Sequence, residues 1–124
     1  MKPKILIVDD ESAVCKDISQ YLGDKGYNAI TATSGQEALS KLLLEEPELI
    51  LLDIRMPDMD GIECLRQIKK LDKEALVIMV TCITDIVTAT KAIELGAIDY
   101  LTKPLGFEAL EIAITTHLFL KTAH

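Results

Sequence analysis

The chain has 124 residues, of which 49% are hydrophobic and 27% are charged, and its formal net charge is −7. This length suits one domain, residues 1–124, which buries about two thirds of its unfolded surface without disulfides or structural metals. The acidic balance argues against binding a nucleic-acid backbone or an anionic membrane, because both require a basic surface.

Apolar runs and helical periodicities alternate along the first half of the chain. The run Ile5–Val8 is rich in β-branched residues and predicts a strand that is buried on both faces. Apolar residues then recur at helical spacing until glycine offers a cap near residues 23–26. A short strand is predicted at about 29–32. Ser34 follows as an N-cap, with Glu37 placed to complete a capping box for a second helix.

The same alternation continues through the second half of the chain. The runs Leu49–Leu52 and Leu76–Val80 predict two more buried strands. A loop at 54–61, which contains proline and glycine, and a third helix lie between them. The remaining elements are a helix at about 85–95, a strand at about 98–102 and a last helix at about 107–120. The run Tyr100–Thr102 in that strand is, like the others, expected to be buried on both faces.

This order of elements predicts an α/β, doubly wound fold with a five-stranded parallel sheet and five helices on both faces. Few layouts of right-handed crossovers are available to five strands. The flavodoxin-like order 2-1-3-4-5 is one of them, and it places a ligand crevice between strands 1 and 3. The sequence does not prove this order, but the order explains where its acidic residues fall.

Polar residues stand at the ends of four predicted strands. They are, in chain order, Asp9 and Asp10, Asp53, Thr81, and Lys103. Ligands bind outside the carboxyl ends of such strands, so three carboxylates, a hydroxyl and an ammonium are expected in one crevice. Each residue alone is more commonly a helix cap, a loop residue or a surface residue. Their coincidence at four strand ends favours a functional site.

Three carboxylates in one crevice need a counter-charge, because two of them about 4 Å apart repel by roughly 4 kcal/mol at an effective dielectric of about 20. Either one carboxyl stays protonated or a divalent cation lies among them. Oxygen ligands alone favour Mg²⁺, with Mn²⁺ as the alternative. Asp10 and Asp53 are expected as direct ligands and Asp9 as a ligand through water, with the backbone carbonyl of Arg55 as a third protein ligand.

Magnesium in a carboxylate site most often handles phosphate, whose transfer depends on charge neutralisation and positioning. Asp53 stands alone at a central strand end and fits a nucleophile that forms an acyl phosphate. Lys103 would neutralise one phosphoryl oxygen, and the Thr81 hydroxyl would donate to another. No strong general base lies near these strand ends.

These residues, with the stretch Met56–Gly61 and the pair Lys103–Pro104, resemble the receiver domain of two-component response regulators over essentially the whole chain. The resemblance implies a phosphoacceptor and not an enzyme with a separate substrate. Asp53 would take a phosphoryl group from a sensor histidine kinase, a phosphotransfer protein or a small phosphodonor, with Mg²⁺ required. The aspartyl phosphate would form and hydrolyse by self-catalysis.

The resemblance also implies a conformational switch. Thr81 would be drawn toward the phosphate and Tyr100 would turn inward behind it. The face formed by the fourth helix, the fifth strand and the fifth helix would then change and control a downstream protein or an output domain. Homodimerisation on phosphorylation through this face is expected only by analogy.

One departure from the family pattern lies beside the site. Cys82 follows Thr81, where receivers commonly have alanine or glycine. A larger side chain there restricts attacking water, so Cys82, together with Arg55 and Ile83, is expected to slow self-dephosphorylation. Leu105 follows Lys103–Pro104 in place of the usual phenylalanine, with little effect expected on the chemistry.

The cysteines and the chain ends bear on location. The three cysteines, an odd number without close pairs, are expected to be small buried side chains in a reducing cytosol. No apolar stretch approaches the ~20 residues of a membrane span, and no signal peptide precedes the first strand. We therefore expect a cytoplasmic protein that does not contact a membrane.

The sequence argues against three rival functions. An aspartyl-phosphate hydrolase would carry a second acid two residues after its nucleophile, where this chain has Arg55. A flavin-binding module would need a Ser/Thr/Gly-rich loop after the first strand, where residues 9–11 are all acidic. A receiver that has lost its chemistry would lack some of the five polar residues, and all five are present.

Overall fold

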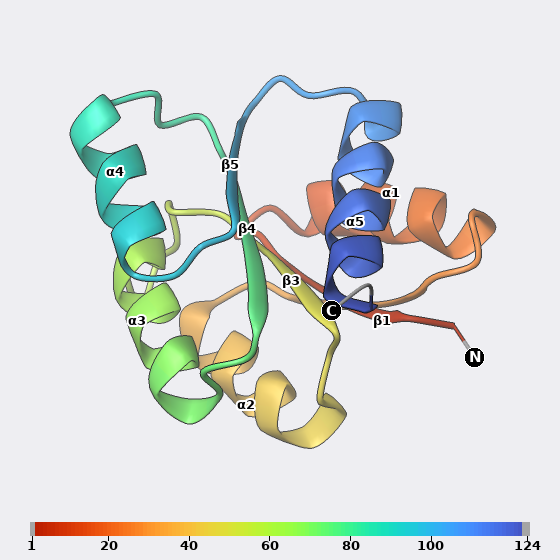
Figure 1. Cartoon of the computed structure of the whole chain (residues 1–124), viewed down its shortest axis with the longest axis horizontal. Helices are drawn as coiled ribbons and strands as arrows, with labels where there is room; N and C mark the ends of the chain where they lie inside the picture. Colours follow the sequence, from red (N-terminus) through yellow and green to blue (C-terminus); the bar gives the residue numbers. More distant parts are fainter. Residues whose placement is uncertain (1, 123–124) are drawn as a thin grey trace.

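The computed structural model describes residues 2–122 and forms a five-stranded sheet with helices on both sides (Figure 1). The strands are β1 (Lys4–Val8), β2 (Asn28–Ala32), β3 (Leu49–Leu52), β4 (Leu76–Thr81) and β5 (Asp99–Thr102). The helices are α1 (Ser12–Asp24), α2 (Gly35–Glu45), α3 (Gly61–Leu71), α4 (Ile86–Glu94) and α5 (Phe107–Thr122). All strand pairs are parallel, and the order β2-β1-β3-β4-β5 confirms the predicted topology.

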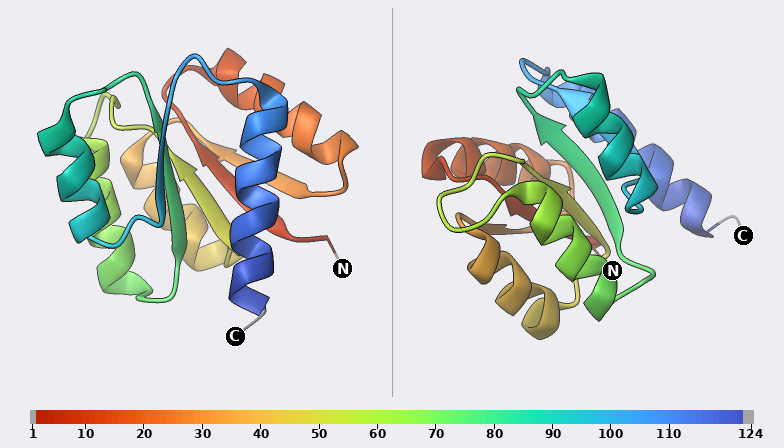
Figure 2. Two further views of the ribbon diagram at one scale, coloured as in Figure 1. Left: turned by 45° about the horizontal axis from the view of Figure 1, so that its top comes forward. Right: turned by 90° about the vertical axis from the view of Figure 1, so that its left-hand side faces the viewer.

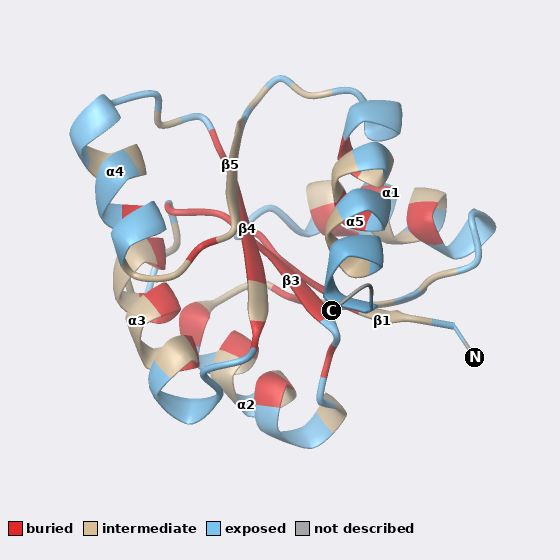
Figure 3. Cartoon of the chain, viewed as in Figure 1, coloured by how far each residue is buried: buried red, intermediate tan, exposed pale blue. Residues whose placement is uncertain are grey.

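The two faces of the sheet pack into two separate hydrophobic clusters. Side chains such as Leu6, Ile50 and Met79 point toward α2, α3 and α4, and their neighbours along the same strands point toward α1 and α5. Figure 2 shows the helices divided between the faces in this way, and Figure 3 shows the buried strands between them. Burial on both faces explains why the central strands are continuously apolar.

Burial on both faces holds for the central strands only. β1, β3 and β4 are almost completely buried, but β5 is half-buried and ends in the exposed Thr102. The prediction that the run ending at Thr102 is buried on both faces is therefore wrong, because β5 is an edge strand with one sheet neighbour.

The start of α2 follows the predicted capping chemistry. The Ser34 Oγ accepts a hydrogen bond from the Glu37 N–H at 3.1 Å. The Glu37 carboxylate reaches back to accept from the Thr33 N–H at 2.7 Å, one residue earlier than in the usual capping box.

Within residues 2–122, none of the helices has the length and hydropathy of a membrane span.

The cysteines divide into two environments. Cys15 and Cys64 are buried, as predicted, and burial raises the pKa of Cys15 to about 11 and that of Cys64 to about 12. Cys82 is exposed. The expectation of a buried side chain is wrong for Cys82, because this residue follows β4 in the loop and has left the sheet.

Gly61 lies where a side chain would collide with the end of β3. An added Cβ would stand 2.2 Å from the Asp53 carbonyl oxygen and 2.5 Å from the Ile54 Cα. We expect Gly61→Ala to lower the free energy of unfolding by about 1–3 kcal/mol, because backbone atoms must shift to admit the methyl group. Urea unfolding measures this.

Gly23→Ala is the matched control, since it adds the same methyl group within α1, where the new group would meet no atom within 4 Å beyond the neighbouring backbone of its own helix. It should raise the free energy of unfolding by up to about 1 kcal/mol, because alanine is the better helix former. Equal effects of the two substitutions on the free energy of unfolding would show that the close backbone contact at Gly61 does not restrict the residue at this position.

Candidate functional site

The strand register brings Asp9 and Asp53 to neighbouring positions. Val8 pairs with Leu52, so the residues that follow them leave the sheet side by side. The Asp53 N–H donates to the Val8 carbonyl at 3.0 Å, and the Asp9 N–H donates to the Ala32 carbonyl at 3.1 Å. Backbone hydrogen bonds thus continue one residue past each strand and hold both acids at the C-terminal edge of the sheet.

The three predicted acids form one cluster. Asp9, Asp10 and Asp53 each offer a carboxylate oxygen, and these oxygens lie within 4.8 Å of one another. Asp9 and Asp53 are only 4% and 7% exposed, whereas Asp10 is exposed. The cluster therefore has two acids fixed in the protein and one facing solvent.

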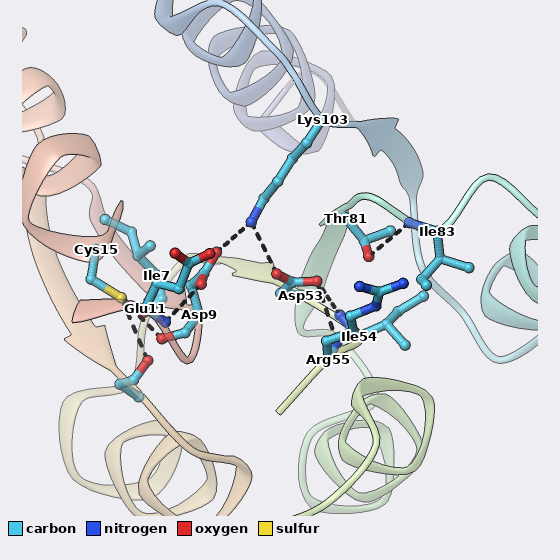
Figure 4. A network of polar contacts seen from close by, with 11 residues as sticks. Ile7, Asp9, Glu11, Cys15, Asp53, Ile54, Arg55, Thr81, Ile83 and Lys103 are labelled. Carbon is cyan, nitrogen blue, oxygen red and sulfur yellow. Dashed lines mark hydrogen bonds and ion pairs between the residues drawn. The ribbon is translucent and has the colours of Figure 1, made fainter. Parts of the chain in front are cut away.

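Lys103 lies between the two buried acids (Figure 4). Its Nζ is 2.6 Å from Asp9 Oδ2 and 3.0 Å from Asp53 Oδ2. Partial burial opposes the ammonium charge, but the hydrogen bonds that Lys103 donates to Asp9 and to Asp53 outweigh this effect, and the pKa of Lys103 is raised. Lys103 was expected only as a ligand for phosphate. In this structure it also supplies counter-charge to the acids, a solution that the sequence reasoning did not consider.

Backbone groups orient the remaining carboxylate oxygens. Asp53 Oδ1 accepts hydrogen bonds from the N–H groups of Ile54 at 2.7 Å and Arg55 at 3.4 Å. Asp9 Oδ1 accepts from the Glu11 N–H at 3.0 Å. These backbone donors therefore hold both carboxylates in fixed orientations.

A cleft of about 330 Å³ opens over the cluster. Its lining residues are Asp10, Glu11, Val14, Asp53, Arg55, Cys82 and Lys103. Arg55 and Cys82, two of the three predicted tuning residues, are exposed and border the cleft. The third, Ile83, does not line it and packs against the hydrophobic cluster beneath α2, α3 and α4. Glu11 was not predicted as a site residue, although its position directly after the acidic pair was a signal for it.

Thr81 and Tyr100 meet at the backbone of Ile83. Thr81 is fully buried, and its Oγ1 accepts a hydrogen bond from the Ile83 N–H at 3.3 Å. The half-buried Tyr100 donates from its hydroxyl to the Ile83 carbonyl at 2.6 Å, and burial raises the pKa of Tyr100. The structure thus connects both predicted switch residues through one peptide segment of the β4–α4 loop, residues 82–85.

The donor set suits a hard divalent cation. The cluster holds the three carboxylates of Asp9, Asp10 and Asp53, and the ammonium of Lys103 compensates only one of their charges. Mg²⁺ prefers oxygen ligands, is commonly bound through one or two carboxylates and keeps several waters. The exposed Asp10 leaves room for those waters, so the residues present fit this ion. That the Arg55 backbone carbonyl is also a ligand of the ion stays a prediction.

The chain matches the family described as response regulator receiver domain over residues 5–115. It is 39% identical over 110 residues to the transcriptional regulatory protein ZraR of Escherichia coli (strain K12), covering 89% of this chain and 25% of that protein. The chain thus spans about a quarter of this curated relative's length.

Solved structures agree with this match. A CheY-like response regulator receiver domain protein from Methanospirillum hungatei JF-1 is 32% identical with a TM-score of 0.96, covering 99% of this chain and 98% of that one. The CheX–CheY–BeF3–Mg²⁺ complex from Borrelia burgdorferi contains a chain that is 33% identical with a TM-score of 0.89, covering 94% of this chain and 89% of that one.

Proposed function

This chain belongs to the response regulator receiver family, and from that premise we propose that Asp53 is the phosphoacceptor of a two-component system. The observation that carries the proposal is the position of the Asp53 carboxylate, which borders an open cleft beside two other acids and the Lys103 ammonium. The phosphoryl donor is a sensor histidine kinase or a phosphotransfer protein. The domain would comprise residues 1–124.

In the proposed transfer, a carboxylate oxygen of Asp53 attacks phosphorus and forms an O–P bond. The P–N bond of the donor phosphohistidine breaks, and its electron pair leaves with the imidazole. Lys103 exchanges its hydrogen bond to Asp53 for one to a phosphoryl oxygen, and the Thr81 hydroxyl donates to another. Positioning and charge neutralisation thus carry the reaction, and hydrolysis by water returns Asp53 to its free carboxylate.

The receiver family binds Mg²⁺ at its acidic pocket, and this chain has the corresponding cluster of aspartates. Asp10 and Asp53 would hold the ion directly, Asp9 through water, and Arg55 through its backbone carbonyl. Mg²⁺ would supply neutralisation of phosphoryl charge, and Mn²⁺ is the alternative. The name of the similar CheX–CheY complex includes both BeF3 and Mg²⁺, which supports this assignment.

A switch follows from the contacts of Ile83. When Thr81 turns toward a phosphoryl oxygen, it gives up its hydrogen bond to the Ile83 N–H, and the loop that leads into α4 is released. Tyr100 follows because it is bonded to the same residue. The face of α4, β5 and α5, which exposes Ile86, Val87 and Ile112, would then meet a downstream protein, an output domain or a second copy.

Intact mass after incubation with acetyl phosphate tests the phosphoacceptor function. One phosphoryl group should be gained with Mg²⁺ present and none after chelation. Equal uptake with and without the metal would contradict the role of the acidic cluster. Turnover of a phosphoester substrate would instead revive a hydrolase function.

Cys82 is proposed to restrict the water that hydrolyses the phosphoryl group. It is exposed and borders the cleft. We expect Cys82→Ala to speed loss of the phosphoryl group by about threefold, which corresponds to a barrier lowered by less than ~1 kcal/mol. The decay of phosphorylated protein after removal of the donor measures this rate.

Cys82→Ser is the matched control because it nearly keeps the side-chain size and removes the thiol. It should decay as slowly as the wild type if size is the cause. An unchanged rate in Cys82→Ala would end this part of the proposal.

A further inference from the structure

The β3–α3 loop, residues 54–60, is fastened at its tip to a different helix. Asp58 Oδ1 accepts a hydrogen bond from the Gly35 N–H at 2.8 Å, and its Oδ2 accepts from the Gln36 N–H at 2.9 Å. These N–H groups belong to the first turn of α2, where a helix has no backbone acceptors of its own. One carboxylate thus binds two such donors at the positive end of the helix dipole.

A steric contact accompanies these hydrogen bonds. A Cβ added to Gly35 would lie 2.2 Å from the Met59 Cγ, so the Met59 side chain rests directly on the Gly35 backbone. The right-hand view of Figure 2 shows the loop passing beside the start of α2. The hydrogen bonds from Gln36 and Gly35 also lower the pKa of Asp58, so its carboxylate is ionised at neutral pH.

Both sides of this contact lead to the acidic cluster. On the loop side, Asp53 Oδ1 binds the N–H groups of Ile54 and Arg55. On the helix side, β2 ends at Ala32, whose carbonyl accepts the Asp9 N–H at 3.1 Å. The start of α2 is three residues beyond Ala32. Asp58 therefore joins the loop that follows Asp53 to the corner that supports Asp9.

We propose that Asp58 is a positioning residue for the metal pocket: its carboxylate clamps the β3–α3 loop to α2 and so fixes the Arg55 backbone relative to Asp9 and Asp53. This inference rests on the proposed function, since it concerns the same Mg²⁺ site. A loop that is already ordered loses less conformational entropy when it binds a ligand. Without the clamp, Mg²⁺ binding would have to order residues 54–60, and this loss of conformational entropy would weaken the affinity for the ion.

Calorimetric titration with Mg²⁺ alone, without a phosphodonor, tests the clamp. Asp58→Ala should weaken Mg²⁺ binding by about three- to tenfold, somewhat less than the ~10–100-fold loss found when a group bonded directly to a metal ligand is removed. Asp58→Asn keeps the side-chain shape and one acceptor oxygen, so its affinity should fall between those of the alanine variant and the wild type. Amide hydrogen exchange should also show reduced protection at Gly35 and Gln36 in Asp58→Ala.

Ser34→Ala is the matched control. It removes another cap of the same helix, the Ser34 Oγ bond to the Glu37 N–H, without touching the loop. Urea unfolding should show a loss of stability in both alanine variants, but only Asp58→Ala should change the Mg²⁺ affinity. A purely structural role for Asp58 would move the unfolding and leave the affinity unchanged.

Three results would overturn the inference, and they distinguish failure of the clamp from failure of the proposed metal site. Unchanged Mg²⁺ affinity in Asp58→Ala, or equal weakening in Ser34→Ala, would overturn the clamp and leave the proposed function standing. Failure of the wild-type protein to bind Mg²⁺ would overturn the proposed metal site and the clamp together.

Discussion

Replacing Asp53 with asparagine should abolish phosphoryl uptake, lowering its rate by roughly 10³-fold or more, the scale on which enzymes lose activity with their nucleophile. The amide keeps an oxygen for the Ile54 N–H, which Asp53 Oδ1 now binds at 2.7 Å, but it lacks the negative charge that attacks phosphorus. Intact mass after incubation with acetyl phosphate and Mg²⁺ measures the loss.

Asp60→Asn is the matched control for this substitution. Asp60 ends the same loop, and its Oδ1 accepts from the Ile62 N–H at 2.6 Å as the N-cap of α3. Asparagine is an equally good N-cap, so Asp60→Asn should be phosphorylated like the wild type. Uptake by Asp53→Asn at the rate of this control would contradict the assignment of Asp53.

Replacing Lys103 with methionine should lower the free energy of unfolding at neutral pH by about 3–5 kcal/mol in the absence of metal, because it leaves two buried carboxylates without their shared cation. The Asp9 and Asp53 side chains are 5% and 9% exposed, so water compensates little. Saturating Mg²⁺ should restore more stability to this variant than it adds to the wild type, because the ion replaces the missing positive charge. Urea unfolding with and without Mg²⁺ measures both effects.

Lys4→Met is the control for losing an ion pair at the surface. Lys4 pairs with Glu45 at 3.3 Å, and their side chains are 30% and 42% exposed. Such pairs contribute less than about 1 kcal/mol. If Lys103→Met were no more destabilising than Lys4→Met, the pairing of Lys103 with both acids would not hold in solution.

Most of the fold can be predicted from the sequence because the patterns that indicate strands and helices are local. Continuous apolar runs marked the buried central strands, and the alternation with helices left few topologies to choose from. The exposure of β5 cannot be predicted in this way, because an edge strand and a central strand differ in their neighbours, and these depend on the whole sheet. The same limit applies to Cys82, whose exposure is decided by where the chain leaves β4.

The cluster of Asp9, Asp10 and Asp53 can be predicted from the sequence because parallel strands present their C-terminal ends at one edge of the sheet. The contacts that long side chains and loops make cannot be predicted in the same way. The reach of Lys103 from the edge strand to Asp9 and Asp53 depends on the twist and packing of the sheet. Nothing in the local sequence around Asp58 indicates that its carboxylate binds a helix 22–23 residues earlier in the chain.

The position of the phosphoryl adduct tests the phosphoacceptor role most directly. After incubation with acetyl phosphate and Mg²⁺, the acyl phosphate can be trapped by reduction with borohydride, and the modified peptide can be sequenced by mass spectrometry. We predict a single modified site at Asp53, which disappears when Mg²⁺ is chelated. A modification at another residue, or a yield at Asp53 that is the same without the metal, would contradict it.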